Sequence, residues 1–214
     1  MNIPAFLVLI AFSALMCIRS EYREQKIFIY IFKPLTTIFI IFLALQTDGF
    51  NFFSYKNLIL AGLVFSLFGD VFLMLPKDRF VAGLASFLMA HLLYIFAFSS
   101  QSGFHFSWWI LLPLLIVAVA IFNILRQGLG KLKIPVIMYM MAIIIMAWQA
   151  LEWWNFSYET RAIFASIGAI LFVFSDSVLA IDRFSKPFKS AKALILLTYY
   201  SAQVLIVLST VNFG

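Results

Sequence analysis

The chain has 214 residues, of which 64% are hydrophobic and 11% are charged, and its mean hydropathy is +1.05. A soluble domain carries about a quarter charged residues, so this composition excludes an ordinary soluble domain and indicates a polytopic membrane protein. The single cysteine, Cys17, excludes an intramolecular disulfide. No basic run is long enough to support nucleic-acid binding, although the net charge is +6.

Apolar runs long enough to cross a bilayer, roughly 17–25 residues each, recur eight times along the chain. The first run has no basic residues before it, so we expect a retained helix and not a cleaved signal peptide. We predict an all-α bundle of eight transmembrane helices, forming a single integral membrane domain over residues 1–214. The predicted spans are 3–19, 27–46, 57–75, 80–99, 106–125, 133–153, 160–181 and 190–211.

Basic residues indicate how the bundle is oriented, because loops rich in Lys and Arg stay in the cytoplasm. Only Lys56 and Arg161 fall on one side of the predicted spans, and Lys33 lies inside a span. The other 12 of the 15 basic residues lie in the odd-numbered loops: Arg19, Arg23, Lys26, Lys77, Arg79, Arg126, Lys131, Lys133, Arg183, Lys186, Lys189 and Lys192. We therefore expect cytoplasmic odd loops, both termini outside, and location in a bacterial inner membrane.

Two segments 106 residues apart resemble each other. The segment "GLVFSLFGDVFLML" starts at Gly62 and contains Asp70, and "GAILFVFSDSVLAI" starts at Gly168 and contains Asp176. Phe68, Leu73 and Tyr94 have identical partners at the same offset. Because an even number of spans separates the two segments, we predict a parallel repeat of four helices plus four.

Polar side chains inside the spans are the candidate functional residues. A lone Asp near the bilayer centre costs on the order of 2.5–3.5 kcal/mol, so such residues usually mark a site. The candidates are Asp70, Asp176, Lys33, His91, Tyr94, Tyr199, Tyr200 and Gln203. Each alone also fits a simpler role, either a side chain that reaches the interface or a hydrogen bond between helices. Together they predict one polar cavity that opens toward the cytoplasm.

Other polar residues fit simpler roles. Asp78, Arg79, Asp182 and Arg183 fall just beyond spans, where water or headgroups can solvate them. Glu152 and the pairs Trp108/Trp109 and Trp153/Trp154 are typical of outer-interface anchors. With only two histidines, a three-histidine zinc site is impossible, and we expect neither a metal nor a cofactor. A Ser–His–Asp triad stays open, although no local signature supports it.

The segments "KPLTT", "FGDVFLM", "GLASFLMAHLLY", "SDSVLA" and "TYYSAQVLI" together resemble the lysoplasmalogenase family, the YhhN-like group that includes the transmembrane protein 86 enzymes. The resemblance implies an eight-helix membrane hydrolase that cleaves the vinyl ether bond of lysoplasmalogens. The products would be a fatty aldehyde and glycerophosphoethanolamine or glycerophosphocholine. It places the family's acidic positions on Asp70 and Asp176, and its other polar positions on Lys33, His91, Tyr94, Tyr199, Tyr200 and Gln203.

Two carboxyl groups suit this reaction, because vinyl ether hydrolysis needs a proton donor, a negative charge beside an oxocarbenium ion and a base for water. We expect one of Asp70 and Asp176 to act as the acid and the other as stabiliser and base. The histidine and tyrosines would orient water, and Lys33 would be a counter-ion or a phosphate ligand. The substrate would be a lysophospholipid among membrane lipids. The alternatives are a small transporter or lipid-binding protein that uses the same cluster, or a purely structural membrane protein.

Overall fold

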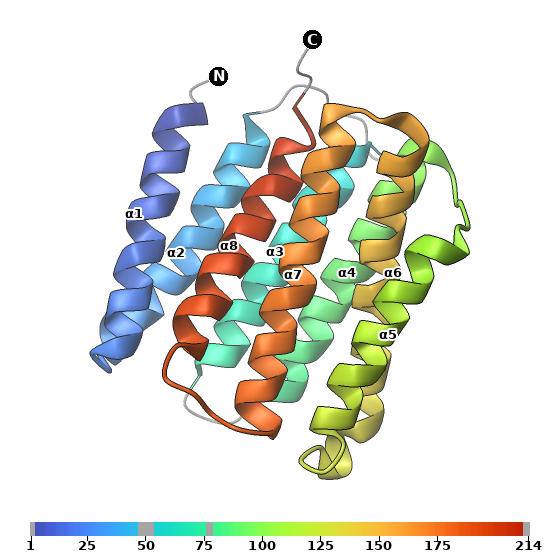
Figure 1. Ribbon diagram of the computed structural model, residues 1–214. Coiled ribbons are helices and arrows are strands. Elements are labelled where there is room, and N and C mark those ends of the chain that lie inside the picture. Colours follow the sequence, from blue (N-terminus) through green and yellow to red (C-terminus); the bar gives the residue numbers. More distant parts are fainter. Residues whose placement is uncertain (1–2, 47–53, 76–78, 212–214) are drawn as a thin grey trace.

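The computed structural model describes residues 3–46, 54–75 and 79–211, and every long regular element within these ranges is an α-helix (Figure 1). The elements are α1 (Ile3–Tyr22), α2 (Lys26–Leu45), α3 (Tyr55–Met74), α4 (Phe80–Ser102), α5 (Trp108–Leu125), the 3-10 turn η1 (Gly130–Leu132), α6 (Lys133–Ser157), α7 (Thr160–Phe184) and α8 (Ala191–Leu208). Within the described ranges, eight helices are long and apolar enough to cross a membrane. The predicted all-α architecture and eight spans are confirmed.

Local signals end the helices close to the predicted positions. The Ser54 side chain accepts a hydrogen bond from the Asn57 backbone N–H and caps the start of α3. Gly103, with φ of +86°, ends α4, because glycine adopts this left-handed backbone without a steric cost. Tyr158, with φ of +55° and ψ of 19°, ends α6 in the left-handed helical region. Helices α4, α6 and α7 each extend a few residues beyond the predicted spans.

The two ends of the chain lie at the same end of the bundle, as an even number of spans requires (Figure 1). Helices α1 and α2 form one flank, α5 and α6 form the other, and α3, α7 and α8 lie between them. The most extensive contacts join α3 to α4 and α7 to α8. These four helices bring the candidate acidic, histidine and tyrosine side chains into the centre of the bundle.

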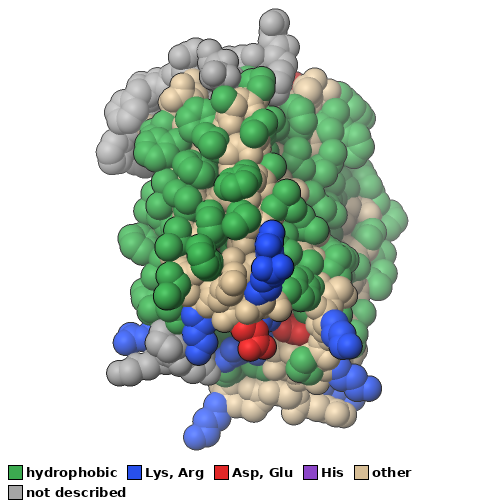
Figure 2. Space-filling model, turned by 90° about the vertical axis from the view of Figure 1, so that its left-hand side faces the viewer, with side chains coloured by type: hydrophobic (Ala, Val, Ile, Leu, Met, Phe, Trp, Pro, Cys, Tyr) green, Lys and Arg blue, Asp and Glu red, His purple; other side chains and the backbone are tan. Residues whose placement is uncertain are grey.

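Basic side chains gather at the end of the molecule opposite the chain termini, below a broad band of hydrophobic side chains (Figure 2). The band is wide because many large apolar residues, such as Val8, Phe12 and Ile116, are more than half exposed. In water such a surface would be unfavourable, whereas a lipid bilayer solvates it. The bundle is therefore an integral membrane protein. Which side each end faces stays a prediction, and Lys77 and Asp78 lie outside the described residues.

The expectation that Glu152 and both tryptophan pairs anchor the outer interface is correct for only part of the set. Trp108, Trp109 and Trp154 are exposed, but Glu152 and Trp153 are each only 1% exposed. The Glu152 carboxylate accepts hydrogen bonds from the Ser107 hydroxyl (2.9 Å), the Ser107 backbone N–H and the Trp148 indole N–H (2.8 Å). It therefore ties the segment before α5 to α6 inside the protein.

Candidate active site

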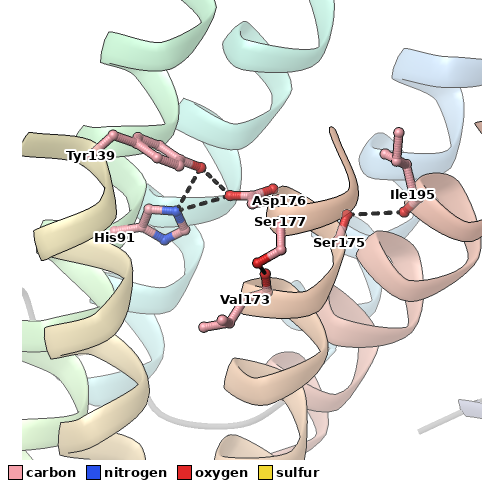
Figure 3. A network of polar contacts seen from close by, with 7 residues as sticks. All are labelled: His91, Tyr139, Val173, Ser175, Asp176, Ser177 and Ile195. Carbon is pink, nitrogen blue, oxygen red and sulfur yellow. Dashed lines mark hydrogen bonds and ion pairs between the residues drawn. The ribbon is translucent and has the colours of Figure 1, made fainter. Parts of the chain in front are cut away.

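Asp176 on α7 lies in a polar cluster with His91 of α4 and Tyr139 of α6 (Figure 3). The Tyr139 hydroxyl donates a hydrogen bond to Asp176 Oδ2 and lies 2.9 Å from His91 Nε2. His91 Nε2 lies 3.6 Å from the same carboxylate oxygen. The arrangement lets a proton pass between the imidazole, the phenol and the carboxyl group. Neighbouring Ser175 and Ser177 bond instead to backbone carbonyls of Ile195 and Val173.

A pocket borders this cluster and contains about 680 Å³ of empty space, part of it open to the surroundings. The centre of a water-sized sphere can occupy only about 60 Å³ of it, so the pocket is narrow. Its walls come from α3, α4, α5, α6 and α7, and they are apolar except at Tyr139, Asp176 and Ser177. Asp176 is 15% exposed, and both of its described polar contacts use Oδ2. A long apolar molecule in this pocket would therefore meet a carboxyl group with its Oδ1 atom available.

Asp70 on α3 lies in a second polar cluster, which is more deeply buried. It is 2% exposed, and its Oδ2 atom accepts hydrogen bonds from the Thr37 hydroxyl of α2 (2.7 Å) and the Tyr199 hydroxyl of α8 (2.8 Å). Lys33, one turn before Thr37, is close enough to attract this carboxylate electrostatically. Neither α2 nor α8 contributes to the pocket beside Asp176. Asp70 is therefore held between helices and away from that pocket.

The two carboxylates share no hydrogen bond within the described part of the chain, although they are near enough to repel each other. Aromatic rings separate their partners. The Phe172 ring packs against His91, with centroids 4.8 Å apart, and against Tyr199 at 5.4 Å. Phe87 packs edge-on against both Phe172 and Tyr199. The candidates thus converge on one region but form two clusters joined by an apolar layer.

The remaining predicted residues lie on the Asp70 side of this layer. The Tyr94 hydroxyl donates to Gln203 Oε1 at 2.9 Å, and Tyr199 and Gln203 share one face of α8. The Tyr200 hydroxyl donates to the Lys33 backbone carbonyl (3.3 Å) and approaches Cys17 Sγ (3.9 Å). Of the two roles expected for Lys33, counter-ion and phosphate ligand, its attraction to Asp70 supports the first.

Three buried polar atoms near these clusters have no hydrogen-bond partner among the described residues: Ser66 Oγ, His91 Nδ1 and Gln203 Nε2. All three side chains are 0% exposed. Buried polar atoms are almost always satisfied, by protein or by internal water.

Sequence reasoning missed two residues that contact the acids, Thr37 and Tyr139. Thr37 lies in the "KPLTT" segment, four positions after Lys33. This spacing puts both side chains on one face of the helix, and that was the available signal. Tyr139 lies alone in the apolar run "IMYMMA". A single phenol in an apolar helix is a weak signal, because tyrosine is also common at membrane interfaces. Only the packing of α6 against α4 and α7 places its hydroxyl beside Asp176.

Comparison with known proteins shows that the chain is similar to membrane proteins of a single family. A protein-family model described as the YhhN family matches residues 28–210. "Uncharacterized membrane protein YhhN" of Escherichia coli O157:H7 is 31% identical over 202 residues, covering 94% of this chain and 96% of the relative. No solved structure matches the chain.

Two animal relatives have an activity in their names. Lysoplasmalogenase TMEM86B of Homo sapiens is 38% identical over 162 residues, covering 74% of this chain and 65% of the relative. Lysoplasmalogenase TMEM86A of Bos taurus is 34% identical over 184 residues, covering 82% of this chain and 75% of the relative. The family match over residues 28–210 includes every residue of the two polar clusters.

Proposed function

The chain belongs to the YhhN family, and from that premise we propose that it is a membrane-embedded hydrolase that cleaves the vinyl ether bond of lysoplasmalogens. The products are a fatty aldehyde and a glycerophospho-alcohol. The observation that carries the proposal is the carboxyl group of Asp176, bonded to Tyr139 and beside His91, at the edge of an otherwise apolar pocket. The apolar lining of the pocket suits the hydrocarbon tail of a lipid.

The reaction begins when Asp176 transfers a proton to the alkenyl carbon that is not bonded to oxygen. The carbon–carbon double bond supplies the electron pair, and an oxocarbenium ion forms at the neighbouring carbon. The Asp176 carboxylate left behind stabilises this cation, as carboxylates do in glycosidases. Because Tyr139 bonds to Oδ2, Oδ1 is the atom that delivers the proton.

Water then adds to the oxocarbenium carbon and gives its proton back to Asp176. The resulting hemiacetal collapses when a proton moves from its hydroxyl group to the glycerol oxygen, which leaves as an alcohol, and the aldehyde remains. Tyr139 and His91 Nε2 keep the carboxyl group oriented between the two proton transfers.

Asp70 has a supporting role in this scheme. It lies outside the pocket, and its Oδ2 atom is occupied by Thr37 and Tyr199. Tyr199 packs against Phe87, and Phe87 is part of the pocket wall. The Asp70 cluster therefore keeps that wall in place, and Asp176 contacts the reacting atoms.

The test is Asp176→Asn in purified, detergent-solubilised protein, with lysoplasmalogen as substrate and the aldehyde measured by mass spectrometry. An amide cannot deliver the proton, so we expect aldehyde release to fall at least ~100-fold. The matched control is Glu159→Gln, which removes a charge from an exposed position at the other end of α7. The control should retain wild-type activity, and full activity in Asp176→Asn would remove this carboxyl group from the mechanism.

The same assay separates the enzyme from the alternative of a transporter. An enzyme consumes lysoplasmalogen in detergent micelles, where no two compartments exist. A transporter would leave the substrate intact in micelles and move it only in sealed vesicles. If wild-type protein forms no aldehyde, the hydrolase proposal is refuted.

A further inference from the structure

A groove runs between α5 and α6, the pair of helices that forms one flank of the bundle (Figure 1). It contains about 960 Å³ of empty space, and the centre of a water-sized sphere can occupy about 440 Å³ of it. Val119 and Met141 line it and are each more than half exposed, so the groove opens to the membrane. Among the described residues that line it, Trp148 has the one polar group, and its indole N–H is bonded to Glu152. Such a lining solvates hydrocarbon and offers nothing to a polar group.

The groove shares part of its wall with the pocket beside Asp176. Ala118 of α5 and Met140 and Ile144 of α6 line both spaces, so in places a single side chain separates them. Ala118 is small, and methionine has three rotatable bonds that let its side chain move aside. A small rearrangement of Met140 would therefore join the groove to the pocket.

The dimensions of the two spaces suit different parts of a lipid. The pocket is too narrow for a whole hydrocarbon tail, whereas the groove is wide. The groove is lined by residues between 111 and 122 on α5 and between 137 and 148 on α6, which is about 16 Å along each helix. Half of a hydrocarbon layer of roughly 30 Å is about as long, so the groove has the length of one lipid tail.

The groove also begins at the level of the proposed catalytic group. Tyr139, which bonds to Asp176, directly precedes Met140 near the start of α6. From this level the groove continues for about 13 Å toward Trp148, away from the basic end of the bundle. A tail in the groove would therefore start beside the carboxyl group and extend toward the opposite end of α6.

We propose that the groove between α5 and α6 holds the hydrocarbon tail of the lysophospholipid, with the vinyl ether in the pocket beside Asp176. This inference rests on the proposed function for its substrate. Because the bilayer already solvates the tail, the groove adds little through hydrophobic transfer. It contributes by position, since a tail held between two helices directs its first carbons at the wall that Ala118 and Met140 form.

The experiment compares Val119→Trp, which fills the groove, with Val117→Trp. Val117 is 44% exposed on the same helix and does not line the groove. The substrates are two alkenyl-glycerophosphoethanolamines, one with a tail that spans a leaflet and one with a tail of a few carbons. We expect Val119→Trp to lower the ratio of kcat/KM for the long tail to that for the short tail about tenfold, because the indole occupies the path of the long tail. Val117→Trp should keep the wild-type ratio, and the same ratio in both variants would overturn the proposal.

Photocrosslinking of the wild-type protein tests the groove without the reaction and without a variant. The probe is lysophosphatidylethanolamine, which has no vinyl ether, with a diazirine at the end of its tail. We expect crosslinks at residues 111–122 and 137–148 that an excess of unmodified lysophosphatidylethanolamine removes. Such crosslinks, together with no hydrolysis by wild type, would refute the hydrolase and keep the tail site. Crosslinks spread equally over the exposed residues of α1 and α2 would refute the tail site.

A second copy of the chain is the other occupant that an apolar groove of this kind could take. Light scattering of the purified protein in detergent distinguishes it from a lipid tail. We expect the same mass for wild type, Val119→Trp and Val117→Trp. A dimer that Val119→Trp alone dissociates would show that the groove is an interface between copies, and it would overturn the proposal.

Discussion

Two acidic residues that look equivalent in the sequence have different surroundings in the structure. Asp176 is partly exposed at a pocket and bonds to a tyrosine beside a histidine. Asp70 is buried, with two hydroxyl groups donating to a single oxygen atom. The first environment suits chemistry on a bound molecule, and the second suits a structural crosslink between α2, α3 and α8.

This difference predicts separate effects of two substitutions at Asp70. Asp70→Ala leaves the Thr37 and Tyr199 hydroxyl groups without an acceptor, which should destabilise the protein by about 1–3 kcal/mol for each group. Asp70→Asn keeps an acceptor oxygen and should destabilise it much less. Unfolding in detergent, followed by circular dichroism, measures both, with the exposed Glu159→Ala as the control. Equal stability of Asp70→Ala and wild type would contradict the crosslink.

At the scale of helices, close contacts join α3 to α4 and α7 to α8 at equivalent glycines. A Cβ atom on Gly62 would lie 2.2 Å from the Tyr94 ring, and one on Gly168 would lie 2.9 Å from the Ala202 carbonyl oxygen. The polar partners of the two acids also come from equivalent helices. Asp70 has partners on α2 and α8, and Asp176 has partners on α6 and α4, which are the equivalent helices in a four-plus-four repeat. The repeat stays a prediction, and this arrangement of partners supports it.

The glycine contact predicts that Gly62→Ala pushes the Tyr94 ring away and breaks its hydrogen bond to Gln203. Overpacking of this kind costs about 1–3 kcal/mol, so the unfolding midpoint in detergent should fall. Val64→Ala is the comparison, since Val64 is 39% exposed on the same helix. The packing argument fails if Gly62→Ala is as stable as Val64→Ala.

At the scale of the whole molecule, charge and hydrophobic surface are arranged as a membrane requires. The basic end also contains contacts that close the bundle: Lys192 pairs with Glu21 at 2.8 Å, and the Tyr22 hydroxyl donates to the Lys189 carbonyl oxygen. These contacts join the last turn of α1 to the start of α8 and to the connection that precedes it. Phe80 and Phe184, which line the pocket, lie at this same end.

The orientation is tested with single cysteines in a Cys17→Ala background. Gln101→Cys lies at the end of the bundle that holds the termini, and Ser185→Cys lies at the basic end. We expect a membrane-impermeant maleimide to label Gln101→Cys in intact cells and Ser185→Cys only after permeabilisation, because basic loops stay in the cytoplasm. The reverse pattern would place the basic end of the bundle on the outside.

The sequence by itself determined the class of protein, the number of spans and the family. Span length against bilayer thickness is a local property, and the motif segments are contiguous, so neither needs the tertiary structure. It also indicated most polar residues of both clusters. The tertiary structure alone decided that Asp176 borders the pocket, that Tyr139 and Thr37 bond to the acids, and that Glu152 and Trp153 are buried. The physical reason is that lipid and protein interior are both apolar, so a membrane helix carries little sequence pattern that shows which face turns inward.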